Sequence, residues 1–416
     1  MIAGVNGLDK QAHPSTHPAR SGRRRVAVAG GGTAGHVTSA VAILAAYRAN
    51  FDADVYFIGC RDGFAARLIP AGGFELKIIP SAPYVRQSMA GKAWALVELV
   101  RGTPAARRLL KAMQTDLVIG LGGYASLGAI LAAKLLGIPS VIHEANVFPG
   151  LANRMLGSLA DRVFLGWEQA RGSFQTKSVV TGNPIRRNMG ALARQLREPG
   201  GDLQILVTGG SAGSPFLNEN VPLLLARVRD LGVPLKVRHQ AGAGETERVR
   251  GRYQGQGIQA RIEEFIDDMA AAYRESDYVI TAAGALTLAE LAMAGLPALL
   301  VPQSAAAGGH QIANAEVYSE LSGGAWVREE DWDSERLAVS LAATLGDLDV
   351  LVAQANRLRG WAHRTRRRSW WKNAKLSWTD IRAGNNCDSK YRTCCNTRVV
   401  SGIANSLGLL LTVRGP

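Results

Sequence analysis

The chain has 416 residues, of which 47% are hydrophobic and 6% aromatic, and its formal net charge is +14. Because its length exceeds a usual domain of about 100–200 residues, we expect two domains of a globular α/β type. The charge lies at the ends: residues 1–25 carry +4 and residues 357–416 carry +11, which leaves −1 for residues 26–356. A nearly neutral body argues against a nucleic-acid-binding protein.

Cysteine content and hydropathy argue against two further classes. Three of the four cysteines, Cys387, Cys394 and Cys395, lie near the carboxyl end, so Cys60 stands alone in the body and no disulfide framework is expected. Residues 1–24 lack the apolar stretch of a signal peptide, and no run reaches the roughly 18 apolar residues of a transmembrane helix. We therefore expect a cytoplasmic protein that can still contact a membrane surface.

Short β-branched runs alternate with helical stretches along the first half of the chain. This alternation is typical of a parallel sheet covered by helices. The expected strands are 26–29, 54–58, 76–79, 116–120, 140–143, 162–165 and 178–180, and the expected helices are 36–48 and 127–136.

The same pattern restarts after a polar stretch, which predicts a second domain of the same kind. Its expected strands are 203–208, 235–239, 261–265, 278–281 and 297–302, and its expected helices are 215–231, 285–294 and one from about 310. The predicted organisation is a basic segment 1–25, a first domain 26–182, a linker 183–202, a second domain 203–356 and a tail 357–416.

The tail is basic, contains four of the eight tryptophans, and shows no clear periodicity before residues 403–413. One interpretation is a basic and aromatic patch for a membrane or a nucleic acid. The interpretation we favour is a sequence foreign to this fold, such as the translation of a shifted reading frame.

Two glycine-rich turns, at 30–36 and 209–214, each follow an apolar strand and lead into a helix. Backbone N–H groups and the helix dipole make such a turn a site for phosphate. Dinucleotide-binding enzymes use similar turns, but the strand 55–58 is followed by Gly59, Cys60 and Arg61 rather than by an acid that could bind ribose. The NAD interpretation is therefore disfavoured.

Nine motifs, spread in order over about residues 26–350, resemble those of the MurG family of N-acetylglucosaminyltransferases. They are GGGTAGHV (30–37), GGYAS (122–126), HEAN (143–146), GNPIR (182–186), GGS (209–211), HQAG (239–242), EFIDDM (264–269), GALTLAE (284–290) and HQIANA (310–315). The resemblance implies the GT-B architecture, which is an α/β fold with two Rossmann-like parallel-sheet domains facing one cleft.

The same resemblance implies an inverting hexosyltransferase. It would move N-acetylglucosamine from UDP-N-acetylglucosamine to the 4-hydroxyl of the muramoyl sugar of lipid I, the undecaprenyl-diphosphate-linked muramoyl pentapeptide, and so give lipid II for peptidoglycan synthesis. The expected location is peripheral, at the cytoplasmic face of the cell membrane. We expect no cofactor and no metal, since no Asp-x-Asp lies at a plausible site and helix N-termini with an arginine can neutralise UDP.

The alternative is a degenerate or inactive paralogue that binds UDP-sugar or lipid without turnover. It is suggested by departures from the family pattern before two of the motifs, at Ala282, Ala283, Gly308 and Gly309.

On the acceptor side, histidine is the usual base for a hydroxyl nucleophile, so His36 is the candidate catalytic residue. His36 could instead only position the acceptor, or serve as a structural residue of the turn. The resemblance assigns the acceptor diphosphate to the two turns of the first half, namely to Gly31, Gly32, Gly35, Gly122, Gly123, Tyr124 and Ser126.

On the donor side, the resemblance implies that the Glu290 carboxylate binds the ribose hydroxyls and that the backbone of Ile266 reads uracil. Arg186 and Ser211 match positions that contact the UDP phosphates, and Gln311 matches a glutamine that contacts the sugar. The remaining donor residues implied are Thr33, Ala34, Gly35 and Asn146, the last of which lies near the donor sugar or the acceptor.

A lipid-linked acceptor also requires contact with the bilayer surface. An apolar segment beside a basic one is the candidate, with Trp94, Val97, Val100, Arg101, Arg107, Arg108 and Lys111. An ordinary amphipathic helix packed on the sheet explains the same pattern equally well.

Overall fold

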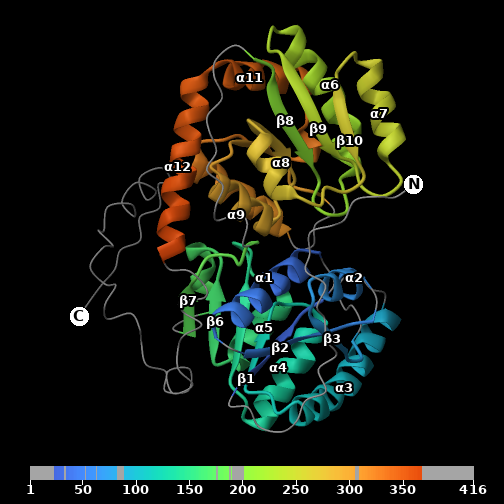
Figure 1. The fold of residues 1–416 in the computed structure, drawn as a ribbon, viewed down its shortest axis with the longest axis vertical. Coiled ribbons are helices and arrows are strands. Elements are labelled where there is room, and N and C mark those ends of the chain that lie inside the picture. Colours follow the sequence, from blue (N-terminus) through green and yellow to red (C-terminus); the bar gives the residue numbers. More distant parts are fainter. Residues whose placement is uncertain are drawn as a thin grey trace, which may run out of the picture. The chain divides into compact units, whose positions relative to one another are not determined.

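The computed structural model of the chain describes residues 23–31, 34–51, 53–61, 63–81, 89–174, 177–186, 189, 201–304 and 309–367. In the first half, seven parallel strands form one sheet in the order β3-β2-β1-β4-β5-β6-β7 (Figure 1). The strands are β1 (Arg24–Ala29), β2 (Ala53–Gly59), β3 (Glu75–Ile78), β4 (Leu117–Gly120), β5 (Ser140–Glu144), β6 (Arg162–Leu165) and β7 (Ser178–Val180).

Helices cover both faces of this sheet, as parallel strands require, because each connection must cross back over the sheet. Those of the first half are α1 (Ala34–Asn50), α2 (Phe64–Ala71), α3 (Met89–Ala112), α4 (Tyr124–Leu136), α5 (Leu151–Leu159) and the 3₁₀ helix η1 (Glu168–Ser173). Helices α3, α4 and α5 pack on the face that carries Ala27 and Ile58. Fully buried alanines of α4, among them Ala129 and Ala133, keep that helix close to the strands.

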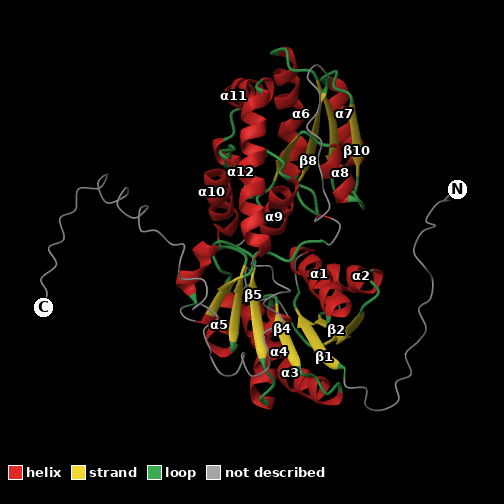
Figure 2. Cartoon of the chain, turned by 60° about the vertical axis from the view of Figure 1, so that its left-hand side comes forward, coloured by secondary structure: helices red, strands yellow, loops and turns green. Residues whose placement is uncertain are grey.

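The second half has a five-stranded parallel sheet in the order β10-β9-β8-β11-β12. Its strands are β8 (Leu203–Thr208), β9 (Leu235–Gln240), β10 (Ala260–Glu263), β11 (Tyr278–Thr281) and β12 (Ala298–Leu300). Its helices are α6 (Pro215–Asp230), α7 (Thr246–Gly255), α8 (Met269–Glu275), α9 (Ala285–Ala294), α10 (His310–Ser322), η5 (Glu329–Asp331), α11 (Ser334–Gly346) and α12 (Leu348–Arg367). Helices α6, α7 and α11 pack on one face, and α8, α9, α10 and α12 belong to the other (Figure 2).

The predicted strands of both halves are confirmed, with ends that differ by a few residues, and so is the α/β class with two parallel sheets. The prediction named no helix at α2, α5, α7, α8, α11 or α12, and two of these, α2 and α5, lie beside proline or glycine. Helix α2 contains Pro70, and α5 follows Pro149 and Gly150, so residues typical of loops concealed both.

Helix α12 corrects the description of the chain beyond residue 357. It continues to Arg367, so residues 358–367 are helical although their sequence shows no clear periodicity. The Trp361 ring stacks on that of Trp167, with ring centroids 5.0 Å apart. Because Trp167 follows β6 of the first sheet, α12 carries a contact between the two halves. Residues 368–416 of the expected tail lie outside the described residues, as does most of the linker expected at 183–202.

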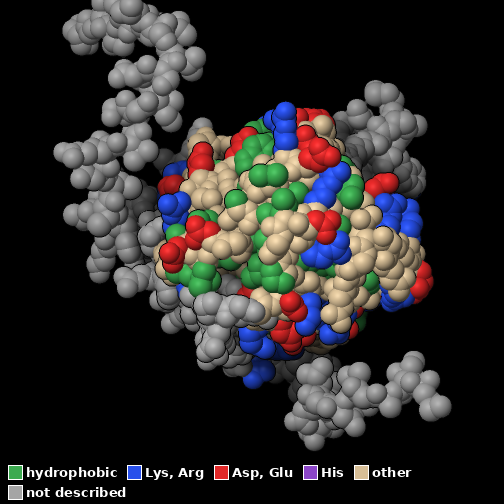
Figure 3. All heavy atoms as spheres, turned by 90° about the horizontal axis from the view of Figure 1, so that it is seen from above, with side chains coloured by type: hydrophobic (Ala, Val, Ile, Leu, Met, Phe, Trp, Pro, Cys, Tyr) green, Lys and Arg blue, Asp and Glu red, His purple; other side chains and the backbone are tan. Residues whose placement is uncertain are grey.

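The surface charges are mixed in sign. On the face that Figure 3 shows, basic and acidic side chains are interspersed and neither sign gathers into one patch. Within the part of the chain that the structure describes, no single helix has the length and apolar character to cross a membrane. The bent pair formed by α11 and α12 is long and apolar enough to do so, by length and composition only.

Candidate active site

The strand orders place the predicted glycine turns at equivalent points of the two sheets. In the first sheet the order reverses between β1 and β4, and the turns that follow these strands begin at Gly30 and Gly122. In the second sheet it reverses between β8 and β11, which lead to Gly209 and Ala282. Open α/β sheets bind ligands at such switch points, outside the carboxyl ends of the strands.

The two turns of the first half touch backbone to backbone. Gly123, with φ of 78°, lies so close that an added Cβ would stand 2.8 Å from the Gly31 carbonyl oxygen. An L side chain would meet both this clash and a left-handed backbone. The pair therefore needs glycine at this point, and it directs the first turns of α1 and α4 to one place.

His36 lies beside this pair. Its Nδ1 is 2.9 Å from the Gly31 carbonyl, which can only accept, so Nδ1 carries the proton. In the neutral ring Nε2 is then an acceptor. A Cβ built on Gly122 would be 3.4 Å from His36 Nε2 and 3.4 Å from Asn153 Oδ1, so these two atoms border the same small space.

Ser126 does not serve a ligand with its side chain. The residue is fully buried, and its hydroxyl oxygen is 2.6 Å from the Ala29 carbonyl and 2.8 Å from that of Gly122. It also accepts from the Leu121 N–H at 3.2 Å. The Ser126 hydroxyl thus holds the turn to β1, and the contact expected between the N–H groups of this turn and a diphosphate stays a prediction.

Glu144, at the end of β5, organises the loop before α5. Its Oε1 accepts from the N–H and the Nδ2 of Asn146, at 2.8 and 3.1 Å. Its Oε2 accepts from the Gly150 N–H at 3.1 Å and from Asn153 Nδ2 at 2.9 Å. A buried carboxylate with four donors fixes the Asn146 side chain, which sequence reasoning placed near the sugar.

In the second half, Gln240 supports the glycine turn after β8. Its Nε2 donates to the Gly210 carbonyl at 2.6 Å, and its Oε1 accepts from the Ile266 N–H at 3.0 Å. Ser214 caps α6 by accepting from the Leu217 N–H. The Ile266 N–H is thus already engaged in this structure, while Ser211 is half-buried beside the turn.

Glu290 is 5% exposed and lies on α9. Its Oε1 is 3.7 Å from Arg186 Nε, and its Oε2 accepts from the Tyr273 hydroxyl at 3.3 Å. Burial raises the pKa of Glu290, and the Arg186 charge and the Tyr273 hydrogen bond oppose that rise. The structure therefore brings together two of the predicted donor residues, Glu290 and Arg186.

Gln311, at the start of α10, pairs with another glutamine. Its Oε1 accepts from the Gln303 N–H at 2.9 Å. Gln303 in turn reaches the carbonyls of Gly209 and Gly213, at 3.4 and 3.5 Å. The predicted sugar contact thus lies next to the predicted phosphate turn.

Some of the residues singled out in the sequence fall on parts of the chain that the structure does not describe. Gly32, Thr33 and Gly308 lie outside the described residues, as does the side chain of Ala34. Gly35 and Tyr124 lie in the first turns of α1 and α4. Ala282 and Ala283, two of the departures from the family pattern, are buried, and Gly309, another of them, is the N-cap residue of α10.

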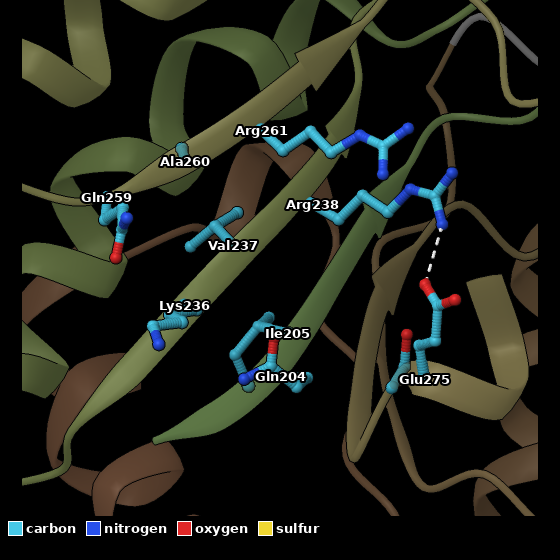
Figure 4. A pocket seen from close by; sticks show the side chains of 10 residues that line it. Gln204, Ile205, Lys236, Val237, Arg238, Gln259, Ala260, Arg261 and Glu275 are labelled. Atoms are coloured by element: carbon cyan, nitrogen blue, oxygen red, sulfur yellow. Dashed lines mark hydrogen bonds and ion pairs between the residues drawn. The ribbon is translucent and has the colours of Figure 1, made fainter.

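A pocket of about 320 Å³ lies elsewhere, at the amino-terminal parts of β8, β9 and β10 (Figure 4). Its three basic side chains each lie against a carboxylate. Arg238 donates to Glu275 at 3.1 Å, and Lys236 and Arg261 pair with other acids. Because it sits at the end of the strands opposite to the glycine turns, it is not the candidate site.

Sequence reasoning missed several side chains that hold this site, namely Asn153, Asn183, Tyr273, Gln303 and Asn314. Asn183 and Asn314 lie within the quoted motifs and the other three lie outside them, and nothing in the sequence distinguishes a ligand contact from a contact within the protein. Across the described residues, no group of three or more His, Cys, Asp or Glu side chains is placed to hold a metal ion.

Comparison with known proteins agrees with this geometry. Residues 26–165 match the model of the glycosyltransferase family 28 N-terminal domain, and residues 204–357 match that of the C-terminal domain. A UDP-N-acetylglucosamine–N-acetylmuramyl-(pentapeptide) pyrophosphoryl-undecaprenol N-acetylglucosamine transferase of Geobacter sp. (strain M21) is 38% identical over 320 residues, which are 76% of this chain and 86% of the relative. The enzyme of the same name from Alcanivorax borkumensis is 40% identical over 323 residues, covering 77% and 88%.

A solved structure is also similar. The crystal structure of MurG from Acinetobacter baumannii superposes with a TM-score of 0.65 at 30% identity, covering 83% of this chain and 95% of that one. Two parallel sheets with these relatives fit the GT-B architecture. The chain belongs to the MurG family of UDP-N-acetylglucosamine–N-acetylmuramyl-(pentapeptide) pyrophosphoryl-undecaprenol N-acetylglucosamine transferases.

Proposed function

We propose that this protein transfers N-acetylglucosamine from UDP-N-acetylglucosamine to the 4-hydroxyl of the muramoyl sugar of lipid I. The observation that carries the proposal is that each of the two sheets has a switch point and that the residues at the two switch points differ. The first half presents His36 beside two glycine turns, and the second presents a glycine turn after β8 and, on α9, Glu290 at 3.7 Å from Arg186. The names of the relatives, which are 35–40% identical, support the same substrates.

His36 is the proposed general base. The Gly31 carbonyl holds the proton on Nδ1, so Nε2 has the lone pair that can take the proton of the acceptor hydroxyl. As the hydroxyl oxygen bonds to the anomeric carbon, the bond from that carbon to the UDP oxygen breaks and UDP leaves with the electron pair. Attack from the side opposite to UDP inverts the anomeric centre. A positioned base of this kind contributes typically about 10²–10⁴-fold.

The donor half supplies binding and charge neutralisation. The N-terminus of α6, capped by Ser214, and the Arg186 guanidinium are the proposed partners of the UDP diphosphate. Among the described residues, the Glu290 carboxylate contacts Arg186 and Tyr273 at distances longer than 3.2 Å, so its two oxygens retain capacity to accept from the ribose hydroxyls.

The acceptor diphosphate is assigned to the backbone of the first half. The N–H groups in the first turns of α1 and α4, including those of Gly35 and Tyr124, are the proposed donors. The contact between Gly31 and Gly123 supports this assignment, because it directs both helix N-termini to one place.

Membrane contact through α3 is a further part of the proposal. Val97 and Val100 on this helix are 43% and 67% exposed, and the basic residues Arg107 and Arg108 are exposed as well. The side chain of Trp94 lies outside the described residues. An exposed apolar and basic helix suits the peripheral, cytoplasmic-face location that a polyprenyl-linked acceptor requires.

The membrane proposal is tested by sedimentation with vesicles that contain phosphatidylglycerol. The double variant Arg107→Glu and Arg108→Glu should bind less. The variant Arg248→Glu and Arg250→Glu, with the same change of charge on α7, is the matched control. Equal binding by both variants would contradict the use of α3.

The enzymatic proposal is tested by transfer of labelled N-acetylglucosamine to a lipid I analogue, with binding of UDP-N-acetylglucosamine measured by calorimetry on the same sample. We expect binding and transfer together. A protein that binds the donor and transfers nothing would instead be the inactive relative, and one that binds neither would overturn the assignment of the donor half.

A further inference from the structure

The loop segment after β5 is attached to the second half by two asparagine side chains. The segment is Ala145–Val147, and the asparagines are Asn183, which follows β7, and Asn314 on α10. On the other side both asparagines reach the turn between β11 and α9, at the carbonyls of Ala283 and Ala285.

Asn314 is fully buried and uses both ends of its amide. Its Oδ1 accepts from the Val147 N–H at 2.9 Å. Its Nδ2 donates to Asn146 Oδ1 at 3.1 Å and to the Ala283 carbonyl at 3.2 Å. A backbone N–H on one end and a carbonyl on the other allow a single orientation of the amide, so Asn314 fixes the distance between the two segments.

Asn183 repeats this arrangement at the other end of the segment. Its Nδ2 donates to the carbonyls of Ala145 and Ala285, at 3.0 and 3.3 Å, and its Oδ1 is 3.1 Å from His143 Nε2. Because Oδ1 can only accept, the His143 Nε2 carries a proton and donates. Gly166 leaves the room for this amide, since a Cβ there would stand 2.2 Å from Asn183 Oδ1.

We propose that Asn183 and Asn314 are positioning residues that couple the donor-side turn 283–285 of the second half to the segment 145–147 of the first half. The inference rests on the proposed function, because it takes the turn before α9 as part of the donor site. Donor binding that orders this turn would then also order Asn146 and Val147, and by linkage acceptor binding would favour the donor. Neither asparagine is assigned a contact with a substrate.

Hydrogen exchange of a peptide that covers residues 145–150 tests the coupling without requiring catalysis. In the wild type, we expect saturating UDP to slow exchange of this peptide. In Asn314→Ala, the loss of two or three buried hydrogen bonds should speed exchange without UDP by about 10–100-fold and abolish the protection by UDP. Asn183→Ala should behave in the same direction.

Two further variants separate positioning from general loss of structure. Gly166→Ala displaces the Asn183 amide without removing it, and its Cβ would also stand 2.9 Å from the Ala145 carbonyl, so it should speed exchange at 145–150 in the same direction as Asn183→Ala. Asn220→Ala is the matched control, because the Nδ2 of Asn220 donates only to Phe216 of its own helix, at 2.9 Å. The control should exchange as the wild type does, and UDP affinity should stay within threefold in all four variants.

Turnover gives the second readout. If the asparagines position the segment 145–147, kcat falls in Asn314→Ala and the KM of a substrate that contacts Asn146 rises, while the affinity for UDP changes little. An unchanged exchange rate at 145–150 in Asn314→Ala, or UDP protection that survives in it, would overturn the coupling. Failure of UDP to bind the wild type would instead overturn the proposed function, and the exchange without UDP would still test the attachment.

Discussion

His239 lies in the core of the second half and makes a testable link between pH and stability. The residue is fully buried on β9, where Nδ1 is 3.0 Å from the Tyr253 hydroxyl and Nε2 is 3.0 Å from Asn218 Oδ1. Asn218 Nδ2 donates to the Ala241 carbonyl, so its Oδ1 faces the histidine and accepts from Nε2. The ring is therefore neutral, with Nδ1 accepting from the tyrosine. Burial lowers the pKa of His239 to about 3.

The sign of the effect follows from the lowered pKa. Between pH 6.5 and about 3 the unfolded chain binds a proton at His239 that the folded chain does not. Stability from this group is thus complete above pH 6.5 and is lost as the pH falls. Linkage gives a loss of about 2 kcal/mol between pH 7.5 and pH 5. Burial lowers the pKa of His143 to about 4, although its hydrogen bond to Asn183 acts in the opposite direction. This residue therefore adds a similar loss of stability in the first half.

The substitution His239→Gln tests this number. Glutamine can donate to Asn218 and accept from Tyr253 but does not titrate, so the variant should be less stable at pH 7.5 and should lose less stability on acidification. The stability difference between the variant and the wild type should therefore shrink by about 2 kcal/mol from pH 7.5 to pH 5. Other titrating groups cancel in this difference.

Urea unfolding at several pH values measures the effect, with hydrogen exchange of β8 and β9 peptides reporting the second sheet by itself. Leu225→Ala, at a fully buried position of α6, is the control, since its loss of about 2–5 kcal/mol does not depend on pH. Parallel pH profiles for His239→Gln and the wild type would refute the assignment of a buried neutral histidine.

Four further predictions concern the candidate site and the contact between the halves. Glu290→Gln should raise the donor KM by about 10–100-fold, the loss expected for hydrogen bonds to a charged acceptor, as steady-state kinetics can measure. Burial raises the pKa of Glu290, so this carboxylate takes up a proton at a higher pH than an exposed glutamate does. Donor affinity of the wild type should therefore begin to fall at that higher pH on acidification, and calorimetry across pH 4–7 measures this. His36→Ala should lower kcat by about 10²–10⁴-fold with donor affinity unchanged. Trp361→Ala should destabilise the protein by about 2 kcal/mol through the lost stacking on Trp167, as thermal unfolding would show.

The sheets and the glycine turns were predictable because their signals are local. A strand buried on both faces needs a run of apolar residues, as in Val26–Ala29 and Leu203–Thr208, and a turn that packs on another backbone needs glycine, as at Gly123. The end of α12 was not predictable in this way. Over residues 357–362, the part of this stretch whose side chains are described, only Leu358 and Ala362 are buried, so the helical period is too weak to detect.

The roles of the polar side chains depend on contacts between distant residues. Ser126 and Asn314 belong to motifs of the same kind as those of His36 and Glu290, yet the first closes a turn and the second joins segments 168 residues apart. A serine or asparagine that contacts a ligand and one that contacts only the protein can lie in motifs of the same kind, with similar neighbours in the sequence. Only the partner atom separates them, and for Asn314 that partner is Asn146, which was itself expected to face a substrate. A substitution at either asparagine that abolishes turnover is therefore not enough to assign a substrate contact, and donor and acceptor binding must be measured separately from kcat.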